Sequence, residues 1–205
     1  MVNYPNGKKT AWIHAPARFG DRGMNLEKDI NTTNQYYLDM DRAVIHKKPT
    51  PVQIVKVDYP MRSAAKITEA YFKIPSTTDY NGVYRGKYID FEAKECQSKT
   101  AFSLSYIHPH QITHLEKCRK HGGICFVIFR LTYHNLTYLV DAQEMIDYIR
   151  GIERKSIPYK WIMTHGHSIQ SYYGRPVDYL EVVDRLYFKN EEVTNVISKE
   201  EEQSE

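Results

Sequence analysis

The apolar residues of the first seventy or so positions predict two helices and two short strands. The first helix begins at Asn25, and its apolar residues recur at helical spacing, at Leu26, Ile30, Tyr37 and Met40. The β-branched segments 43–46 and 52–57, separated by a basic turn with two prolines, predict two strands. Good helix formers in residues 61–72, bounded by prolines at both ends, predict a short second helix.

The pattern after residue 80 predicts further strands and helices in mixed order. Segments 83–85 and 87–94 read as strands, and the second alternates polar and apolar residues, as expected of a strand with one polar face. A helix over residues 109–121 ends at a Gly-Gly pair, and the apolar run Ile124–Leu131 fits a buried central strand. A strand at 137–140 and helices at 143–152 and 176–188 complete the prediction of an α/β domain around a mixed sheet.

Length and charge divide the chain into three parts. Its 205 residues suit one folded domain, which we place at residues 23–189. Residues 1–22 resemble a flexible basic arm, and residues 190–205 resemble an acidic disordered tail with six Glu and one Lys. With the overall net charge at +3, residues 1–189 therefore carry +8. This excess favours an anionic partner, with nucleic acid ahead of a membrane surface.

Cysteine content and hydropathy indicate the cellular compartment of the protein. The three cysteines form no CxxC pair, so we expect free thiols in a reducing cytosol. No apolar run reaches the length of a membrane-spanning helix, and the polar N-terminus lacks the apolar segment of a signal peptide. We therefore expect a cytoplasmic protein with no membrane association.

The most informative polar residues surround the strand predicted at 87–94. Twelve residues separate Asp79 from Glu92, and Lys94 follows on the same strand face because side chains two apart point the same way. A preceding hairpin would bring Asp79 alongside Glu92. Two carboxylates suit a hard divalent cation such as Mg²⁺, and an adjacent Lys can neutralise charge on a phosphate. The pattern indicates phosphodiester hydrolysis, although alternating charges on a solvated strand also produce it. Glu27 on the first helix is a possible additional acid.

Other kinds of chemistry fit less well. His110 and His114 have the HxxxH spacing of helical zinc ligands, but Gln111 stands where a metalloprotease needs a Glu base. A structural zinc site on Cys118 and Cys125 would need two further ligands, and the spacing matches no common finger. The chain has no P-loop and no persuasive serine triad, so NTPase and serine hydrolase activities are not expected.

Several sequence blocks together resemble the RecU family of Holliday junction resolvases. The matching blocks, in chain order, are Arg22-Gly23-x-x-x-Glu27, Ile45–Pro51 (IHKKPTP), Pro75–Gly82 (PSTTDYNG), Ile89–Glu95 (IDFEAKE), His108-x-His110-Gln111 and Gly122-Gly123. The resemblance covers about residues 18–188. Cys96 and residues 103–106 depart from the family's usual sequence, but neither departure removes a metal-site residue.

The resemblance implies a fold and an activity. It implies the restriction-endonuclease-like fold, with a mixed sheet flanked by helices and a stalk insertion at about residues 59–75. It also implies a homodimer that cuts four-way junctions in recombination and DNA repair, with Mg²⁺ as cofactor and Mn²⁺ as a substitute. By position, the family's metal-site residues are matched by Thr77, Asp79, Glu92 and Gln111. Lys94 matches its transition-state-stabilising lysine, so Asp79, Glu92 and Lys94 are the expected catalytic residues.

The basic pattern and the resemblance together suggest where DNA binds. The expected contacts are Arg22 in the arm, Lys47 and Lys48 in the basic turn, and Arg62, Tyr71 and Phe72 on the stalk. The family implies RecA and the RuvAB branch-migration machinery as partners, and a nucleoid-associated location. Two alternatives remain: a non-catalytic protein that binds or anneals branched DNA and modulates RecA, and a nuclease of the same fold that acts on ordinary duplex.

Overall fold

The computed structural model describes residues 26–73 and 77–189. The basic arm with Arg22 and the acidic tail, both predicted from the sequence, lie outside the described residues. The elements, in chain order, are α1 (Leu26–Asp39), β1 (Val44–Lys47), β2 (Val52–Asp58), β3 (Lys66–Phe72), β4 (Tyr80–Tyr84), β5 (Lys87–Cys96), β6 (Ala101–Ser103), α2 (Pro109–Lys120), β7 (Ile124–Leu131), β8 (Leu136–Asp141), α3 (Ala142–Arg150), β9 (Ser156–Pro158), α4 (Tyr159–His165), β10 (His167–Ser168) and α5 (Leu180–Tyr187).

A six-stranded mixed sheet forms the body, with strand order β1-β4-β5-β7-β8-β10. Strands β5 and β7 run parallel and are joined through α2, and the other neighbours in this sheet are antiparallel. The apolar run Ile124–Leu131 is β7, buried in the middle of the sheet as its sequence predicts. The expected mixed α/β fold is therefore confirmed.

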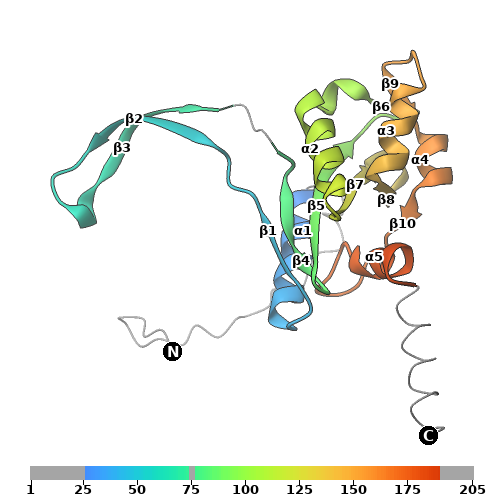
Figure 1. The fold of residues 1–205 in the computed structure, drawn as a ribbon, viewed down its shortest axis with the longest axis horizontal. Coiled ribbons are helices and arrows are strands. Elements are labelled where there is room, and N and C mark those ends of the chain that lie inside the picture. Colours follow the sequence, from blue (N-terminus) through green and yellow to red (C-terminus); the bar gives the residue numbers. More distant parts are fainter. Residues whose placement is uncertain (1–25, 74–76, 190–205) are drawn as a thin grey trace, which may run out of the picture.

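Helices cover both faces of this sheet (Figure 1). Side chains of one face, such as Phe91 and Phe126, pack with residues of α1 and α5. The neighbouring side chains on β7, such as Val127 and Phe129, pack on the opposite face with residues of α2, α3 and α4. Because alternate residues of a strand point to opposite faces, the polar residues of β5 lie on the α2 side. None of the helices among the described residues is long and apolar enough to cross a membrane.

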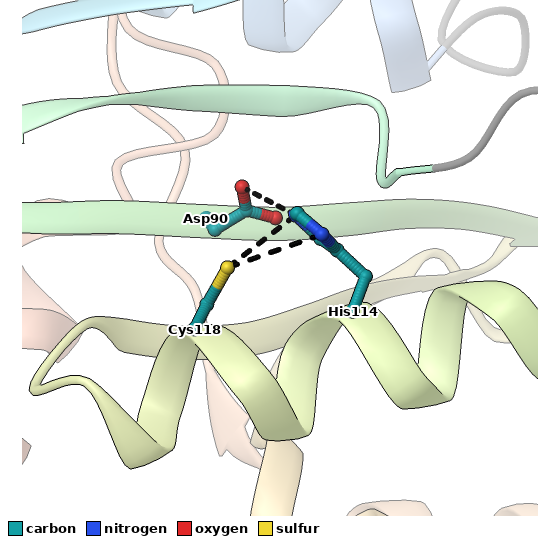
Figure 2. Close-up of side chains that lie close together, drawn as sticks. All are labelled: Asp90, His114 and Cys118. Atoms are coloured by element: carbon teal, nitrogen blue, oxygen red, sulfur yellow. Dashed lines mark hydrogen bonds and ion pairs between the residues drawn. The ribbon is translucent and has the colours of Figure 1, made fainter.

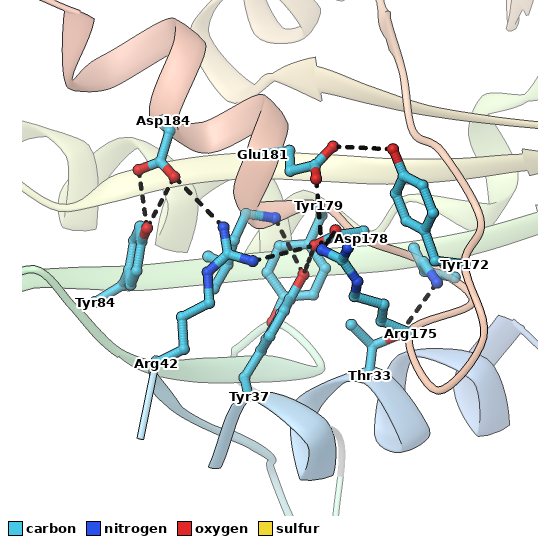
Figure 3. A network of polar contacts seen from close by, with 12 residues as sticks. Thr33, Tyr37, Arg42, Tyr84, Tyr172, Arg175, Asp178, Tyr179, Glu181 and Asp184 are labelled. Carbon is cyan, nitrogen blue, oxygen red and sulfur yellow. Dashed lines mark hydrogen bonds and ion pairs between the residues drawn. The ribbon is translucent and has the colours of Figure 1, made fainter. Parts of the chain in front are cut away.

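A buried carboxylate ties the C-terminal segment to α1 (Figure 3). Asp178 has no solvent exposure, and its carboxylate accepts a hydrogen bond from the Tyr37 hydroxyl at 2.5 Å and pairs with Arg175. Arg42 lies 3.8 Å from the same carboxylate. A buried charge is tolerated only when it is paired and hydrogen-bonded, so these contacts fix the segment before α5 against α1.

The strands β2 and β3 form a two-stranded hairpin that projects far from the body (Figure 1). Every residue of both strands is exposed. We call this hairpin the stalk. It runs from Val52 to Phe72, so it begins before the expected start at residue 59. The expected projecting insertion is present.

The helix predicted over residues 61–72 is wrong. Only Arg62–Ala64 is helical, as a single 3-10 turn at the tip of the stalk, and Lys66–Phe72 pairs with β2 as a strand. Ile67 and Thr68 are β-branched and Tyr71 and Phe72 are aromatic, so this half of the segment favours a strand once a partner strand is available. The strands predicted at 43–46 and 52–57 exist, but they do not pair with each other: β1 pairs with β4, and β2 with β3.

Candidate active site

The hairpin of β4 and β5 brings Asp79 to Glu92. Tyr80 pairs with Phe91 in this hairpin, so Asp79, one residue before β4, lies beside Glu92. The backbone N–H of Asp79 donates to Oε2 of Glu92 at 3.2 Å. The juxtaposition expected from the twelve-residue spacing is therefore present.

Glu92 is a buried acid held between a carboxylate and an ammonium. The residue is 1% exposed, and burial, followed by the nearby charge of Asp79, raises its pKa from 4.5 to about 7. Lys94 Nζ lies 2.6 Å from Oε1 and opposes this shift of the pKa. The three predicted catalytic residues thus form one contiguous group of two carboxylates and one cation.

This group fits a hard divalent cation. Among the described residues, Oε1 of Glu92 has the ion pair with Lys94 but no well-oriented hydrogen bond, which leaves a buried carboxylate oxygen with unused acceptor capacity. Asp79 supplies a second carboxylate beside it. Oxygen ligands of this kind are preferred by Mg²⁺, and a bound cation would offset the cost of burying an ionised Glu92.

Thr77 and Gln111, the other two predicted metal ligands, lie in different parts of the fold. Thr77 lies two residues before Asp79, and its hydroxyl makes a long 3.4 Å hydrogen bond to the carbonyl oxygen of Thr78. Gln111 is buried in the first turn of α2, and its Oε1 accepts a hydrogen bond from the His108 N–H at 3.0 Å. That bond fixes the amide and leaves the oxygen a second lone pair.

Glu27 and Lys47 line a small pocket of about 170 Å³ together with Asp79 and Tyr80. Oε1 of Glu27 lies 2.5 Å from Nζ of Lys47, so this acid is already neutralised by a lysine. The structure therefore places Glu27 near Asp79 but in an ion pair.

A second polar cluster, which sequence reasoning missed, surrounds Asp90 on the same face of β5. The side chain of Asp90 is fully buried. Its Oδ1 accepts a hydrogen bond from the Thr78 hydroxyl. Its Oδ2 lies 2.8 Å from Lys48 Nζ, 2.7 Å from the Tyr88 hydroxyl and 3.1 Å from His114 Nε2. We call Asp90 and these four partners the Asp90 cluster.

Cys118 adjoins the Asp90 cluster, and with Asp90 and His114 it forms a group of potential metal ligands (Figure 2). Its Sγ lies 3.4 Å from His114 Nε2. Nζ of Lys48 lies 2.8 Å from Asp90 Oδ2, so a cationic side chain already occupies this side of the carboxylate. Burial, followed by the charge of Asp90, raises the pKa of the Cys118 thiol.

The predicted DNA-binding residues fall into two sets. Lys48 points inward to Asp90, whereas Lys47 pairs with Glu27 at the edge of the body. Arg62 lies in the turn at the tip of the stalk, and Tyr71 and Phe72 are exposed on β3. The stalk residues are thus available to a ligand, and the side chain of Lys48 is occupied within the protein.

The sequence comparisons with known proteins agree with one another. The family model RecU, Recombination protein U, matches residues 21–185. The chain is 56% identical over 196 residues to the Holliday junction resolvase RecU of Geobacillus kaustophilus (strain HTA426), a match that covers 91% of this chain and 98% of the relative. It is 54% identical over 196 residues to the protein of the same name from Oceanobacillus iheyensis, covering 91% of this chain and 100% of the relative. Among solved structures, it is similar to the Holliday junction resolvase Hjc of Archaeoglobus fulgidus, with a TM-score of 0.34 and 11% identity over 63% of this chain and 85% of that chain.

Proposed function

Since the chain belongs to the RecU family, we propose that it is an endonuclease that resolves Holliday junctions by metal-dependent nicking in recombination and DNA repair. The single observation that supports this activity most strongly is the group of Asp79, Glu92 and Lys94, in which two carboxylates and an ammonium meet at one end of a hairpin. Its relatives from Geobacillus and Oceanobacillus carry the name Holliday junction resolvase.

Mg²⁺ is the cofactor we propose, with Mn²⁺ as a substitute. Asp79 and Glu92 would hold the ion, with Thr77 and Gln111 as further oxygen donors. When bound, such an ion supplies Lewis acidity that activates water and neutralises charge on the scissile phosphate. The donor set consists of oxygens, which is the chemistry that hard cations select.

The side chains of this site have separate tasks in the hydrolysis. Glu92 is fixed by the Asp79 N–H on one oxygen and by Lys94 on the other, so the ammonium is held beside the carboxylates. From that position, Lys94 stabilises the negative charge that develops on the phosphate oxygens in the transition state. The products are a 5′-phosphate and a 3′-hydroxyl.

We propose a homodimer that cuts both opposing strands of a four-way junction. A two-fold dimer would present two such sites to strands related by the same symmetry, so paired nicks follow from matching symmetry. The stalk supplies exposed aromatic and basic residues, Tyr71, Phe72 and Arg62, that suit unstacked bases and phosphates at a crossover. An isolated two-stranded hairpin is marginally stable in water, which also favours a bound partner for the stalk.

The cellular setting follows from this substrate. We propose a cytoplasmic protein associated with the nucleoid, where recombination intermediates arise, with RecA and the RuvAB machinery as partners. The free cysteines of the described residues agree with a reducing compartment.

The test is Mg²⁺-dependent cleavage of a labelled mobile four-way junction beside its matching linear duplex. We expect paired nicks on the junction, none on the duplex and none without a divalent cation. Tight junction binding without nicks would favour a non-catalytic branched-DNA protein, and equal cutting of the duplex would mean that the nuclease acts on a different substrate.

A further inference from the structure

The segment that carries Asp79 has no strand partners of its own. Residues 77–79 lie before β4, and the return from the stalk enters the body here. Four contacts hold this segment. The Asp79 N–H donates to Glu92, the N–H of Lys48 donates to the Asp79 carbonyl oxygen at 2.8 Å, the Thr78 hydroxyl donates to Asp90, and Nζ of Lys48 donates to the Thr78 hydroxyl oxygen. Three of the four involve Lys48 or Asp90 of the Asp90 cluster.

Asp90 also joins the two connections between the stalk and the body. Lys48 directly follows β1 and begins the outgoing connection to β2, whereas Thr78 lies on the returning connection just before β4. Nζ of Lys48 lies 2.8 Å from Asp90 Oδ2 and donates to the Thr78 hydroxyl oxygen at 2.9 Å. Further out, the N–H of Lys73 donates to the carbonyl oxygen of Pro51 at 3.0 Å and pairs the two connections a second time.

The position of Asp90 on β5 links the base of the stalk to the active site. Asp90 stands two residues before Glu92 on the same face of the strand, so both carboxylates are carried by one rigid element. Asp90 fixes the side chain of Thr78, and Glu92 accepts from the next residue along the chain, Asp79. The segment that carries Asp79 is thus held to β5 at two successive positions of one strand face, Asp90 through Thr78 and Glu92 through the Asp79 N–H.

We propose that Asp90 is a positioning residue which, through Thr78 and Lys48, fixes both connections of the stalk to β5 and so holds Asp79 against Glu92. This role rests on the proposed nuclease function. It assigns no metal and no substrate contact to Asp90. Its consequence is that a change at the base of the stalk alters metal binding at Asp79 and Glu92, although no metal ligand has been changed.

The experiment compares Thr78→Val with Thr78→Ser in the full-length chain. Valine keeps the shape of threonine and removes the hydroxyl that Asp90 holds, whereas serine keeps the hydroxyl. Tyr88→Phe is the matched control, because it removes another hydrogen bond to Asp90 from a residue that lies on neither connection. Calorimetry measures Mn²⁺ binding to the DNA-free protein. Single-turnover assays measure the junction cleavage rate, and binding assays in Ca²⁺ measure junction affinity. Thermal unfolding shows whether each variant is folded.

We expect Thr78→Val to bind Mn²⁺ about tenfold more weakly and to cut the junction about tenfold to a hundredfold more slowly, as displaced catalytic groups do. Junction affinity in Ca²⁺ should change little, and Thr78→Ser and Tyr88→Phe should stay close to wild type. Wild-type Mn²⁺ affinity in Thr78→Val would overturn the proposal. Equal losses in Thr78→Val and Tyr88→Phe would also overturn it, since the connections would then have no special role.

The two proposals fail differently. If the wild-type chain does not cut the junction, the proposed function is wrong, and the Mn²⁺ measurement on the DNA-free variants still tests the role of Asp90. If the wild type cuts and Thr78→Val cuts equally well with an unchanged Mn²⁺ affinity, the function stands and the positioning role falls.

Discussion

The backbone N–H of Asp79 donates to Oε2 of Glu92 at 3.2 Å, so one candidate ligand holds the other through its main chain. This contact explains how two acids separated by twelve residues in the sequence share one site: the tight turn between β4 and β5 folds one strand back on the other. It also leaves the Asp79 carboxylate free of that bond. The geometry therefore fixes Glu92 while its neighbour's side chain stays available to a cation.

Replacing Asp79 by Asn should abolish cleavage and preserve junction binding. The amide keeps the shape of the side chain but removes the negative charge that a divalent cation requires. We expect the single-turnover rate to fall by at least about a thousandfold, which corresponds to roughly 4 kcal/mol of activation free energy. Gel-shift assays in Ca²⁺ should give wild-type affinity, and retained cleavage in this variant would refute the assignment of Asp79.

The sequence predicted the core of this site because the information is local. Glu92 and Lys94 share a face through the two-residue period of a strand, and a hairpin was sufficient to add Asp79. The buried central strand β7 could likewise be predicted, from its continuous apolar run. In these places the residues that matter lie within one element or one turn, where periodicity applies.

The Asp90 cluster could not be predicted in the same way. Lys48, Thr78 and His114 come from separate parts of the chain and meet only after the sheet and α2 have assembled. Lys48 therefore looked like a solvated phosphate contact, although its ammonium is bound inside the protein. Only the second strand of the stalk was misread, because Lys66–Phe72 is exposed on both faces and its residues, KITEAYF, show no sustained alternation of polar and apolar positions.

Cleavage at low Mg²⁺ should increase as the pH rises through about 7. Burial and the charge of Asp79 raise the pKa of Glu92 to about 7, and the protonated acid is a poor metal ligand. Below that pH we expect the rate to fall about tenfold per unit. Because the metal and the proton compete for the carboxylate, saturating Mg²⁺ should move the midpoint of the pH profile to lower pH. A midpoint that does not change with the Mg²⁺ concentration would contradict this explanation.

The same pKa shift predicts how the stability of the metal-free protein depends on pH. Glu92 has a higher pKa in the folded chain than its ordinary value of 4.5, so between pH 4.5 and about 7 the folded state binds the proton that the unfolded state has released. Its contribution to the free energy of unfolding is therefore present at low pH and is lost as the pH rises through about 7. Urea unfolding of Glu92→Gln, which cannot ionise, should lack this component.

Removing the ammonium in Lys94→Ala should slow cleavage and raise the pKa of Glu92 further. Lys94 opposes the shift caused by burial, so its loss leaves a buried carboxylate without its paired cation. We expect a rate loss of about 10²–10³, as for other groups that stabilise transition-state charge, and a pH profile displaced upward. Lys120→Ala, at an exposed position at the end of α2, is the control and should behave as wild type.

A side chain at Gly82 should destabilise the fold at the edge of the active-site hairpin. A Cβ there would lie 2.1 Å from the carbonyl oxygen of Val44 and 2.6 Å from Cα of Ile45, so β1 would have to move. We expect Gly82→Ala to lower the free energy of unfolding by about 3 kcal/mol. Gly151→Ala meets no atom closer than 3.4 Å and should change it by less than about 0.5 kcal/mol. Urea unfolding distinguishes the two variants.

Truncating Phe72 should weaken junction binding without affecting stability. Its side chain is 83% exposed at the base of the stalk, so Phe72→Ala removes few internal contacts and should change the free energy of unfolding by less than about 0.5 kcal/mol. Stacking of an aromatic ring on a base is worth about 1–3 kcal/mol, which corresponds to an affinity loss of about fivefold to 150-fold. Tyr173→Ala removes an aromatic ring of similar exposure, 89%, from the body instead of the stalk, and should leave affinity unchanged. Fluorescence anisotropy in Ca²⁺ measures the affinity of both variants for a four-way junction and for a linear duplex.

A loss of affinity that is specific to Phe72→Ala on the junction would place the stalk at the crossover, because only there are base faces exposed. Equal losses on junction and duplex would make Phe72 a general backbone contact.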